Sequence, residues 1–168
     1  MQTWQKLHAA HNLTGVGNRE LLDLPMTAFF ASRQCSGAAI RAAMDWALQQ
    51  ARLKAVVVSG FHSPLEQSVL TVLIAARSPV VAVLARPVQG AKLPPEWADP
   101  LAQGRMAVVS CVATAKRLTN EAAAMRNAQV VQLASEIVVA HASEGGSLAG
   151  LVAQWRKDGR RVTTLSNT

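Results

Sequence analysis

The chain has 168 residues, of which 50% are hydrophobic and 16% are charged. This length fits one domain with a buried core and excludes a disordered tail, and no apolar run approaches the roughly 18 to 20 residues that cross a bilayer. Because 17 Lys and Arg residues outnumber 10 Asp and Glu residues, the formal charge is +7, which favours phosphates, nucleotides or nucleic acid as partners.

Residues 1–25 precede the regular pattern of the chain and are expected to form an N-terminal arm. Trp4, Leu7, His8 and His11 are spaced like one side of a short helix. We expect the arm to pack on the remaining domain, residues 26–168, or on a second subunit.

From residue 26 onward, short apolar runs alternate with helical stretches. The runs are residues 27–31, 55–59, 80–85, 106–111, 137–140 and 162–165. Continuous apolar runs of this length are typical of strands buried on both faces, and helices between such strands indicate parallel connections. The pattern predicts an α/β fold, a Rossmann-like three-layer sandwich with a mainly parallel six-stranded sheet.

In such folds ligands bind beyond the carboxyl ends of the strands, so the residues after each run are the candidate site. The first strand is followed by Ser32 and Arg33, just before a helix whose free N–H groups suit a phosphate. The alternative is that Ser32 or Ser36 only caps this helix and that Arg33 is solvated.

The second strand is followed by Gly60, Phe61 and His62. His62 either donates to a phosphate or is an ordinary surface histidine. The next residues, Ser63 to Glu66, have the pattern of a capping box with proline at the first helical position, which gives Glu66 a sufficient structural role.

The fifth strand is followed by Ser143, Gly145, Gly146 and Ser147. Paired glycines before a helix permit close approach of the backbone and present N–H groups to an anion. This turn is the strongest phosphate-binding candidate, although neither a Walker motif nor a Gly-x-Gly-x-x-Gly fingerprint is present.

Several classes of site are not expected. The histidines and cysteines have no close metal-ligand spacing beyond His8 and His11, and no Gly-x-Ser-x-Gly elbow occurs, so we assign no metal, no cofactor and no catalytic residue. The N-terminal residues lack the apolar stretch of a signal peptide, and two cysteines make no disulfide framework, so a cytoplasmic location is expected.

In this order, the strand-end motifs resemble those of the DNA-processing protein A (DprA/Smf) family, within the lonely-guy and molybdenum-cofactor-carrier-like superfamily. The family's Gly-Ser-Arg corresponds to Ala31-Ser32-Arg33, its Ser-Gly to Ser59-Gly60, its Arg-Asn-Arg to Arg126-Asn127-Ala128, and its Ser-Gly-Ser-Leu turn is echoed by Glu144-Gly145-Gly146-Ser147-Leu148. The family's glycine-rich turn after Ser-Gly is replaced here by residues 61–66.

The resemblance implies a domain that binds single-stranded DNA or nucleotide phosphates in a basic pocket, dimerises and cooperates with a recombinase. The pocket would include Arg126 and Asn127 together with the strand-end residues above. Independently, the large apolar side chains of Trp4, Phe29, Phe30 and Trp97 led us to expect a homodimer, unless all four complete the chain's own core.

The enzymatic relatives provide the alternative, a lonely-guy-like nucleotide phosphoribohydrolase or a small-nucleotide sensor. Their motif, Pro-Gly-Gly-x-Gly-Thr-x-x-Glu, ends in a glutamate that takes part in cleavage. Aligned on Gly145-Gly146, this chain has Ala149-Gly150-Leu151 where that acid would fall, so only Glu66 or Glu144 remain as substitutes. Binding without catalysis is therefore the favoured prediction.

Overall fold

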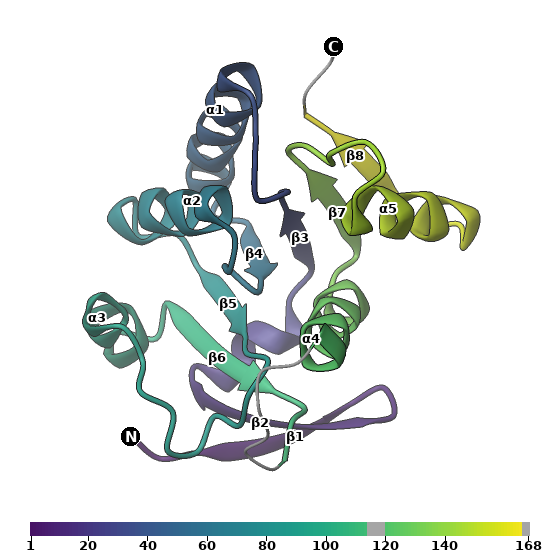
Figure 1. Ribbon diagram of the computed structural model, residues 1–168. Coiled ribbons are helices and arrows are strands. Elements are labelled where there is room, and N and C mark those ends of the chain that lie inside the picture. The colour runs from purple at the N-terminus through teal and green to yellow at the C-terminus, as the bar shows by residue number, and fades with distance from the viewer. Residues whose placement is uncertain (114–119, 166–168) are drawn as a thin grey trace.

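The computed structural model describes residues 1–113 and 120–165, which form a single eight-stranded sheet covered by helices on both faces (Figure 1). The elements in chain order are β1 (Trp4–His8), β2 (His11–Gly17), the 3-10 helix η1 (Arg19–Asp23), β3 (Met26–Phe30), α1 (Gly37–Leu53), β4 (Val56–Ser59), α2 (Pro64–Ala75), β5 (Val80–Val83), the 3-10 helix η2 (Pro95–Trp97), α3 (Ala98–Ala102), β6 (Met106–Ser110), α4 (Asn120–Leu133), β7 (Glu136–Val139), α5 (Ser147–Lys157) and β8 (Val162–Thr164).

The sheet confirms the predicted Rossmann-like architecture. Its strand order is β1-β2-β6-β5-β4-β3-β7-β8, and the six strands from β6 to β8 are parallel to one another. These six are the predicted apolar runs, with ends shifted by one or two residues. The strand count is eight instead of six because an N-terminal hairpin adds two antiparallel strands.

The short helix expected near the N-terminus is wrong, since that segment is strand β1. Along β1, Trp4, Lys6 and His8 are half-buried while the residues between them are exposed, which is the period of a strand. The indole ring of Trp4 lies over its cross-strand partner Gly15, and its Nε1 donates to the carbonyl of Gly17 at 2.9 Å. Packing across the hairpin therefore overrides the helical spacing of the sequence.

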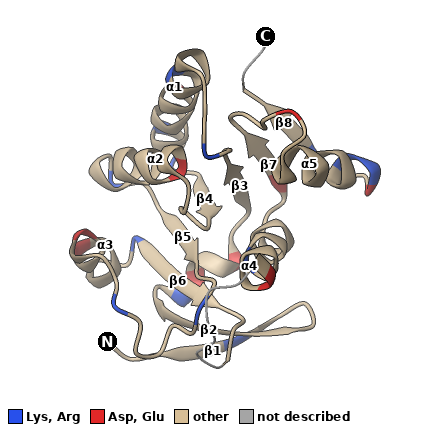
Figure 2. Cartoon of the chain, in the orientation of Figure 1, with Lys and Arg blue, Asp and Glu red and all other residues tan. Residues whose placement is uncertain are grey.

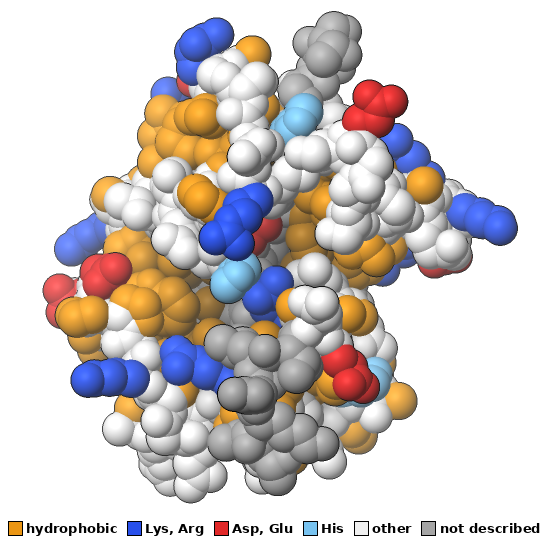
Figure 3. All heavy atoms as spheres, viewed as in Figure 1, with side chains coloured by type: hydrophobic (Ala, Val, Ile, Leu, Met, Phe, Trp, Pro, Cys, Tyr) orange, Lys and Arg blue, Asp and Glu red, His pale blue; other side chains and the backbone are white. Residues whose placement is uncertain are grey.

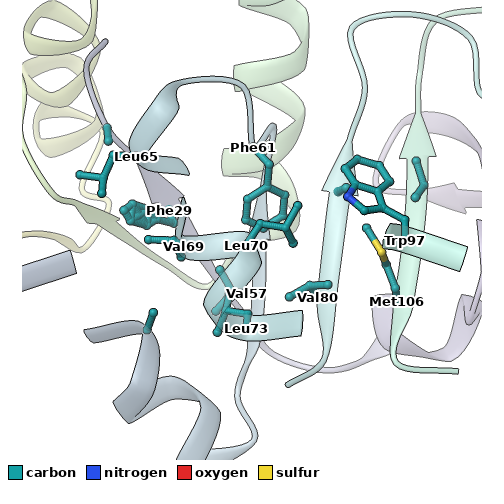
Figure 4. Close-up of a cluster of buried hydrophobic side chains, with 14 of the residues drawn as sticks. Phe29, Val57, Phe61, Leu65, Val69, Leu70, Leu73, Val80, Trp97 and Met106 are labelled. Carbon is teal, nitrogen blue, oxygen red and sulfur yellow. The ribbon is translucent and has the colours of Figure 1, made fainter. Parts of the chain in front are cut away.

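Two hydrophobic cores lie on opposite faces of the sheet, and adjacent residues of β3 separate them. Phe29 points toward α1 and α2 and lies beside Val69 of α2 (Figure 4). Its ring centroid lies 5.1 Å from that of Trp46 in α1. Phe30 points to the opposite face, where its ring lies 4.8 Å from that of Trp155 in α5. The alternation confirms three layers, with α1 to α3 on one side and α4 and α5 on the other (Figure 1).

The four large aromatic residues that led us to expect a homodimer pack within the chain itself. Phe29, Phe30 and Trp97 are buried, and Trp4 is half-buried against the core on the α4 and α5 face. They therefore leave no aromatic surface that argues for a partner. Among the described residues, none of the helices is both long and apolar enough to cross a membrane.

Candidate functional site

The loops that follow β3 and β7 are joined at the carboxyl edge of the sheet. β3 lies between β4 and β7, so the three loops that leave these strands are neighbours. The backbone N–H of Ser32 donates to the carbonyl of His141, and the N–H of Ser143 donates to the hydroxyl of Ser32, both at 2.9 Å. Ser32 thus holds two loops together across 111 residues of sequence.

A pocket of about 770 Å³ opens between these loops and α4. It contains eight of the eleven residues that the sequence predicted: Ser32, Arg33, His62, Arg126, Asn127, Ser143, Gly146 and Ser147. Lys, Arg and His side chains gather near the middle of this face (Figure 3), whereas over the whole chain basic residues are scattered among helices and loops (Figure 2). The net charge alone therefore did not locate the pocket.

The two arginines of the pocket come from different elements. Arg33 follows β3 and is exposed, whereas Arg126 belongs to α4 and is half-buried. The Arg126 Nε and Nη2 atoms each lie 3.3 Å from the Asn127 side-chain oxygen. Burial lowers the pKa of the Arg126 guanidinium, and the nearby Glu66 carboxylate opposes this shift. The fold thus brings two cationic groups that are 93 residues apart in the sequence into one pocket.

Gly60 lies beneath Arg126 instead of lining the pocket. A Cβ atom at Gly60 would lie 2.6 Å from the Arg126 Nε and 2.7 Å from its Cδ. Real side-chain atoms do not approach this closely, so the guanidinium stem of Arg126 occupies the space that a larger residue would fill. Gly60 acts on the pocket by leaving this space free.

The structure places two other predicted site residues outside the pocket lining. Phe61 adopts a left-handed backbone with φ of 46° and is buried in the core beside Leu70 (Figure 4). Gly145 has φ of 71°, a conformation that glycine adopts without strain, and forms the turn before Gly146. Gly145 therefore shapes the chain that lines the pocket.

The Glu66 carboxylate is the part of the site that sequence reasoning underestimated. The predicted capping box is present, with Ser63 and Glu66 bonded reciprocally at the start of α2. Beyond it, the second carboxylate oxygen of Glu66 accepts from the backbone N–H of Ala31 at 3.0 Å, and Glu66 lines the pocket. No sequence signal links Glu66 to Ala31, because that contact depends on the pairing of β3 with β4.

The α5 helix presents its N-terminus to the same pocket. Its N-cap residue, Gly146, makes no side-chain capping bond, whereas Ser36 and Ser63 cap α1 and α2. Gly146, Ser147 and Leu148 line the pocket. The first N–H groups of a helix without a side-chain cap favour an anion. The arrangement as a whole can bind a phosphate between two arginines and a helix end.

Solved structures share this architecture. DNA processing protein A from Streptococcus pneumoniae aligns with a TM-score of 0.76 and 19% identity over 94% of this chain and 56% of that chain. A Helicobacter pylori DNA processing protein A, described for its single-stranded DNA binding mode, aligns with a TM-score of 0.80 and 16% identity over 99% of this chain and 81% of that chain. The Chlamydomonas molybdenum cofactor carrier protein aligns with a TM-score of 0.54 and 14% identity over 84% of this chain and 75% of that chain.

These identities establish the fold alone, and this chain spans only about half of the Streptococcus protein. None of the curated protein sequences matches it. The sequence profile of the family described as DNA recombination-mediator protein A, however, matches residues 5–167, nearly the entire chain. The predicted resemblance is thereby confirmed, and the chain belongs to the DNA recombination-mediator protein A family of DNA-processing proteins.

Proposed function

We propose that this chain binds single-stranded DNA or nucleotide phosphates, without catalysis, in the pocket at the carboxyl ends of β3, β4 and β7. The observation that carries the proposal is the convergence of Arg33 and Arg126 on one cavity of about 770 Å³. Guanidinium groups offer planar pairs of donors that match phosphate oxygens. The single-stranded DNA binding named for the Helicobacter protein supports the same class of ligand.

Phosphate contacts are expected to supply most of the affinity. The chain has no Tyr, four Trp and three Phe residues, and the three Phe rings are buried, so an extended platform for base stacking has few candidates. Backbone contacts release counterions, and binding should therefore weaken steeply with salt and depend little on base sequence.

The decisive experiment titrates oligo-dT and a panel of nucleoside monophosphates at two salt concentrations against the parent, Arg33→Ala and Arg126→Ala. Each variant should lose about tenfold or more in affinity, as expected for a charge-assisted phosphate contact. Arg52→Ala is the matched control, because Arg52 is exposed in the last turn of α1, far from the carboxyl edge. Its affinity should stay within about twofold of the parent.

Absence of binding to either ligand class, or arginine variants that bind like the parent, would contradict the proposal. Release of free base from a nucleotide would instead favour the phosphoribohydrolase alternative. That alternative has weak support, because backbone N–H groups already occupy both oxygens of Glu66. The other candidate acid, Glu144, is exposed and is not among the described residues that line the pocket.

Two further expectations complete the proposal. The family description, recombination mediator, supports action beside a recombinase. The cytoplasmic location stays an expectation. Homodimerisation has support from Ile40 and Leu48, two apolar side chains on α1 that remain exposed in the isolated chain. Light scattering at micromolar concentration tests the dimer, and a monomeric mass would contradict it.

A further inference from the structure

The pocket that presents two arginines also holds a fixed negative charge. Among the described residues that line it, Arg33 and Arg126 carry guanidinium groups and Glu66 carries a carboxylate. One carboxylate against two guanidinium groups leaves one net positive charge. Besides its structural role at the start of α2, Glu66 therefore halves the net positive charge that the pocket presents to an anion.

The position of Glu66 is fixed by three backbone donors. Its Oε1 accepts from the N–H groups of His62 at 2.9 Å and Ser63 at 3.2 Å, and its Oε2 accepts from the N–H of Ala31 at 3.0 Å. The residue is buried, with 7% of its surface exposed, so it cannot swing away from a bound anion. Because all three partners are donors, they suit a side chain that only accepts, which is the ionised carboxylate.

The charge of Glu66 acts on groups around the pocket. Burial lowers the pKa of Arg126, and the Glu66 carboxylate counteracts this change. Burial raises the pKa of Cys35, which follows β3, and the same carboxylate raises it further. A ligand phosphate held near Arg126 lies within reach of the same field.

We propose that Glu66 is a specificity-determining residue, which adapts the pocket to a phosphodiester with one negative charge in preference to a terminal phosphomonoester with two. This inference rests on the proposed function. Attraction to the pocket grows in proportion to ligand charge, whereas the cost of removing the ligand from water grows with the square of its charge. A pocket with one net positive charge therefore favours the monoanion, and an internal phosphate of a DNA strand has that charge.

The test compares dTMP with its methyl ester, which share base and sugar but carry two charges and one charge at pH 8. Calorimetry or NMR titration at low salt gives the ratio of the two Kd values for each protein. The parent should bind the methyl ester at least as tightly as dTMP. Glu66→Gln should shift the ratio roughly tenfold toward dTMP, because loss of the carboxylate charge benefits a dianion more than a monoanion.

Two variants separate charge from structure. Glu66→Asp keeps the charge, so it should keep the parent ratio even if both affinities fall. Glu144→Gln makes the same change in net charge at an exposed position of the β7–α5 loop, outside the described pocket lining, and should shift the ratio by less than about twofold. Thermal unfolding of each variant checks that it is folded.

If Glu66→Gln weakens the affinity for both ligands equally, so that the Kd ratio does not change, the inference is overturned and Glu66 has a structural role only. If Glu66→Gln does not fold, the parent alone decides, because tighter binding of dTMP than of the methyl ester contradicts the inference, and equal or tighter binding of the methyl ester supports it. Failure of the parent to bind either ligand or oligo-dT contradicts the proposed function itself, and is thus distinguishable.

Discussion

Glycines have different roles in the β1–β2 hairpin and at the carboxyl ends of the parallel strands. At the N-terminal edge, Gly15 and Gly17 let the β1–β2 hairpin pack tightly against Trp4 and β6, and the space that they leave is filled by ring and backbone atoms. At the carboxyl edge, Gly60 leaves space that a flexible arginine fills. The comparison indicates that the hairpin glycines contribute to stability, whereas Gly60 positions the charge of Arg126.

Gly17→Ala should have the largest effect on stability. Gly17 has φ of 86°, and a Cβ atom there would lie 2.3 Å from the Met106 carbonyl oxygen and 2.7 Å from the Leu101 Cδ2. Since backbone cannot give way like a side chain, we expect a loss of about 3 kcal/mol in the free energy of unfolding, measured by denaturant titration.

Gly150→Ala is the matched control for that change. Gly150 lies within α5, with no described atom within 4 Å of its added Cβ, so alanine should stabilise the chain by about 0.5 to 1 kcal/mol. Equal effects of the two substitutions would contradict the packing of the hairpin against β6.

In contrast to Gly17→Ala, Gly60→Ala should affect ligand affinity more than stability. The added methyl group displaces the Arg126 stem, which is flexible, and Gly60 is not among the glycines with positive φ. We expect unfolding free energy to change by less than about 1 kcal/mol while oligo-dT affinity falls about tenfold. Fluorescence anisotropy measures the affinity, and unchanged binding would show that the position of Arg126 does not matter for the ligand.

Ser32→Ala should have a smaller effect. It removes the hydroxyl that accepts from the Ser143 N–H and leaves that donor unpaired, at a cost of about 1 kcal/mol. Ser68→Ala is the control, because the Ser68 hydroxyl donates to Pro64 on an exposed face of α2 and its loss should stay within about 0.5 kcal/mol. Thermal unfolding that ranks Ser68→Ala as the more destabilising variant would refute the link between the β3 and β7 loops.

Loss of the ion pair between Lys6 of β1 and Asp23 of η1 should have the smallest effect. Lys6 Nζ lies 2.5 Å from the Asp23 carboxylate, and this hydrogen bond lowers the pKa of Asp23. A lowered folded-state pKa contributes stability at neutral pH that is lost as pH falls through that pKa. NMR titration should find the Asp23 pKa below its ordinary value, and Lys6→Ala should return it toward that value; no change in Lys6→Ala would exclude the pair in solution.

The periodicity of the sequence predicted much of the fold. The buried runs and the helices between them followed from local pattern, and the capping box at Ser63 and Glu66 followed from residue types in four consecutive positions. The N-terminal hairpin escaped prediction, because Trp4, Leu7 and His8 fit a helical period whereas Trp4, Lys6 and His8 fit a strand period, and only pairing with β2 selects between them.

The candidate pocket was predicted less completely. Strand-end residues such as Ser32, Arg33 and Ser147 were found because parallel strands bring their carboxyl ends to one edge. Phe61 was misplaced, since sequence does not reveal that its left-handed backbone turns the ring into the core. Whether the residues that line the pocket bind DNA stays a prediction for the titrations above.

The sequence by itself determined the α/β class, the six buried apolar runs and the family to which the chain belongs, because each follows from local residue patterns. Tertiary structure alone decided that Arg126 rests on Gly60 and that Glu66 reaches Ala31. Those contacts join residues 35 or more positions apart, and their geometry depends on strand order and helix placement, which short-range periodicity does not encode.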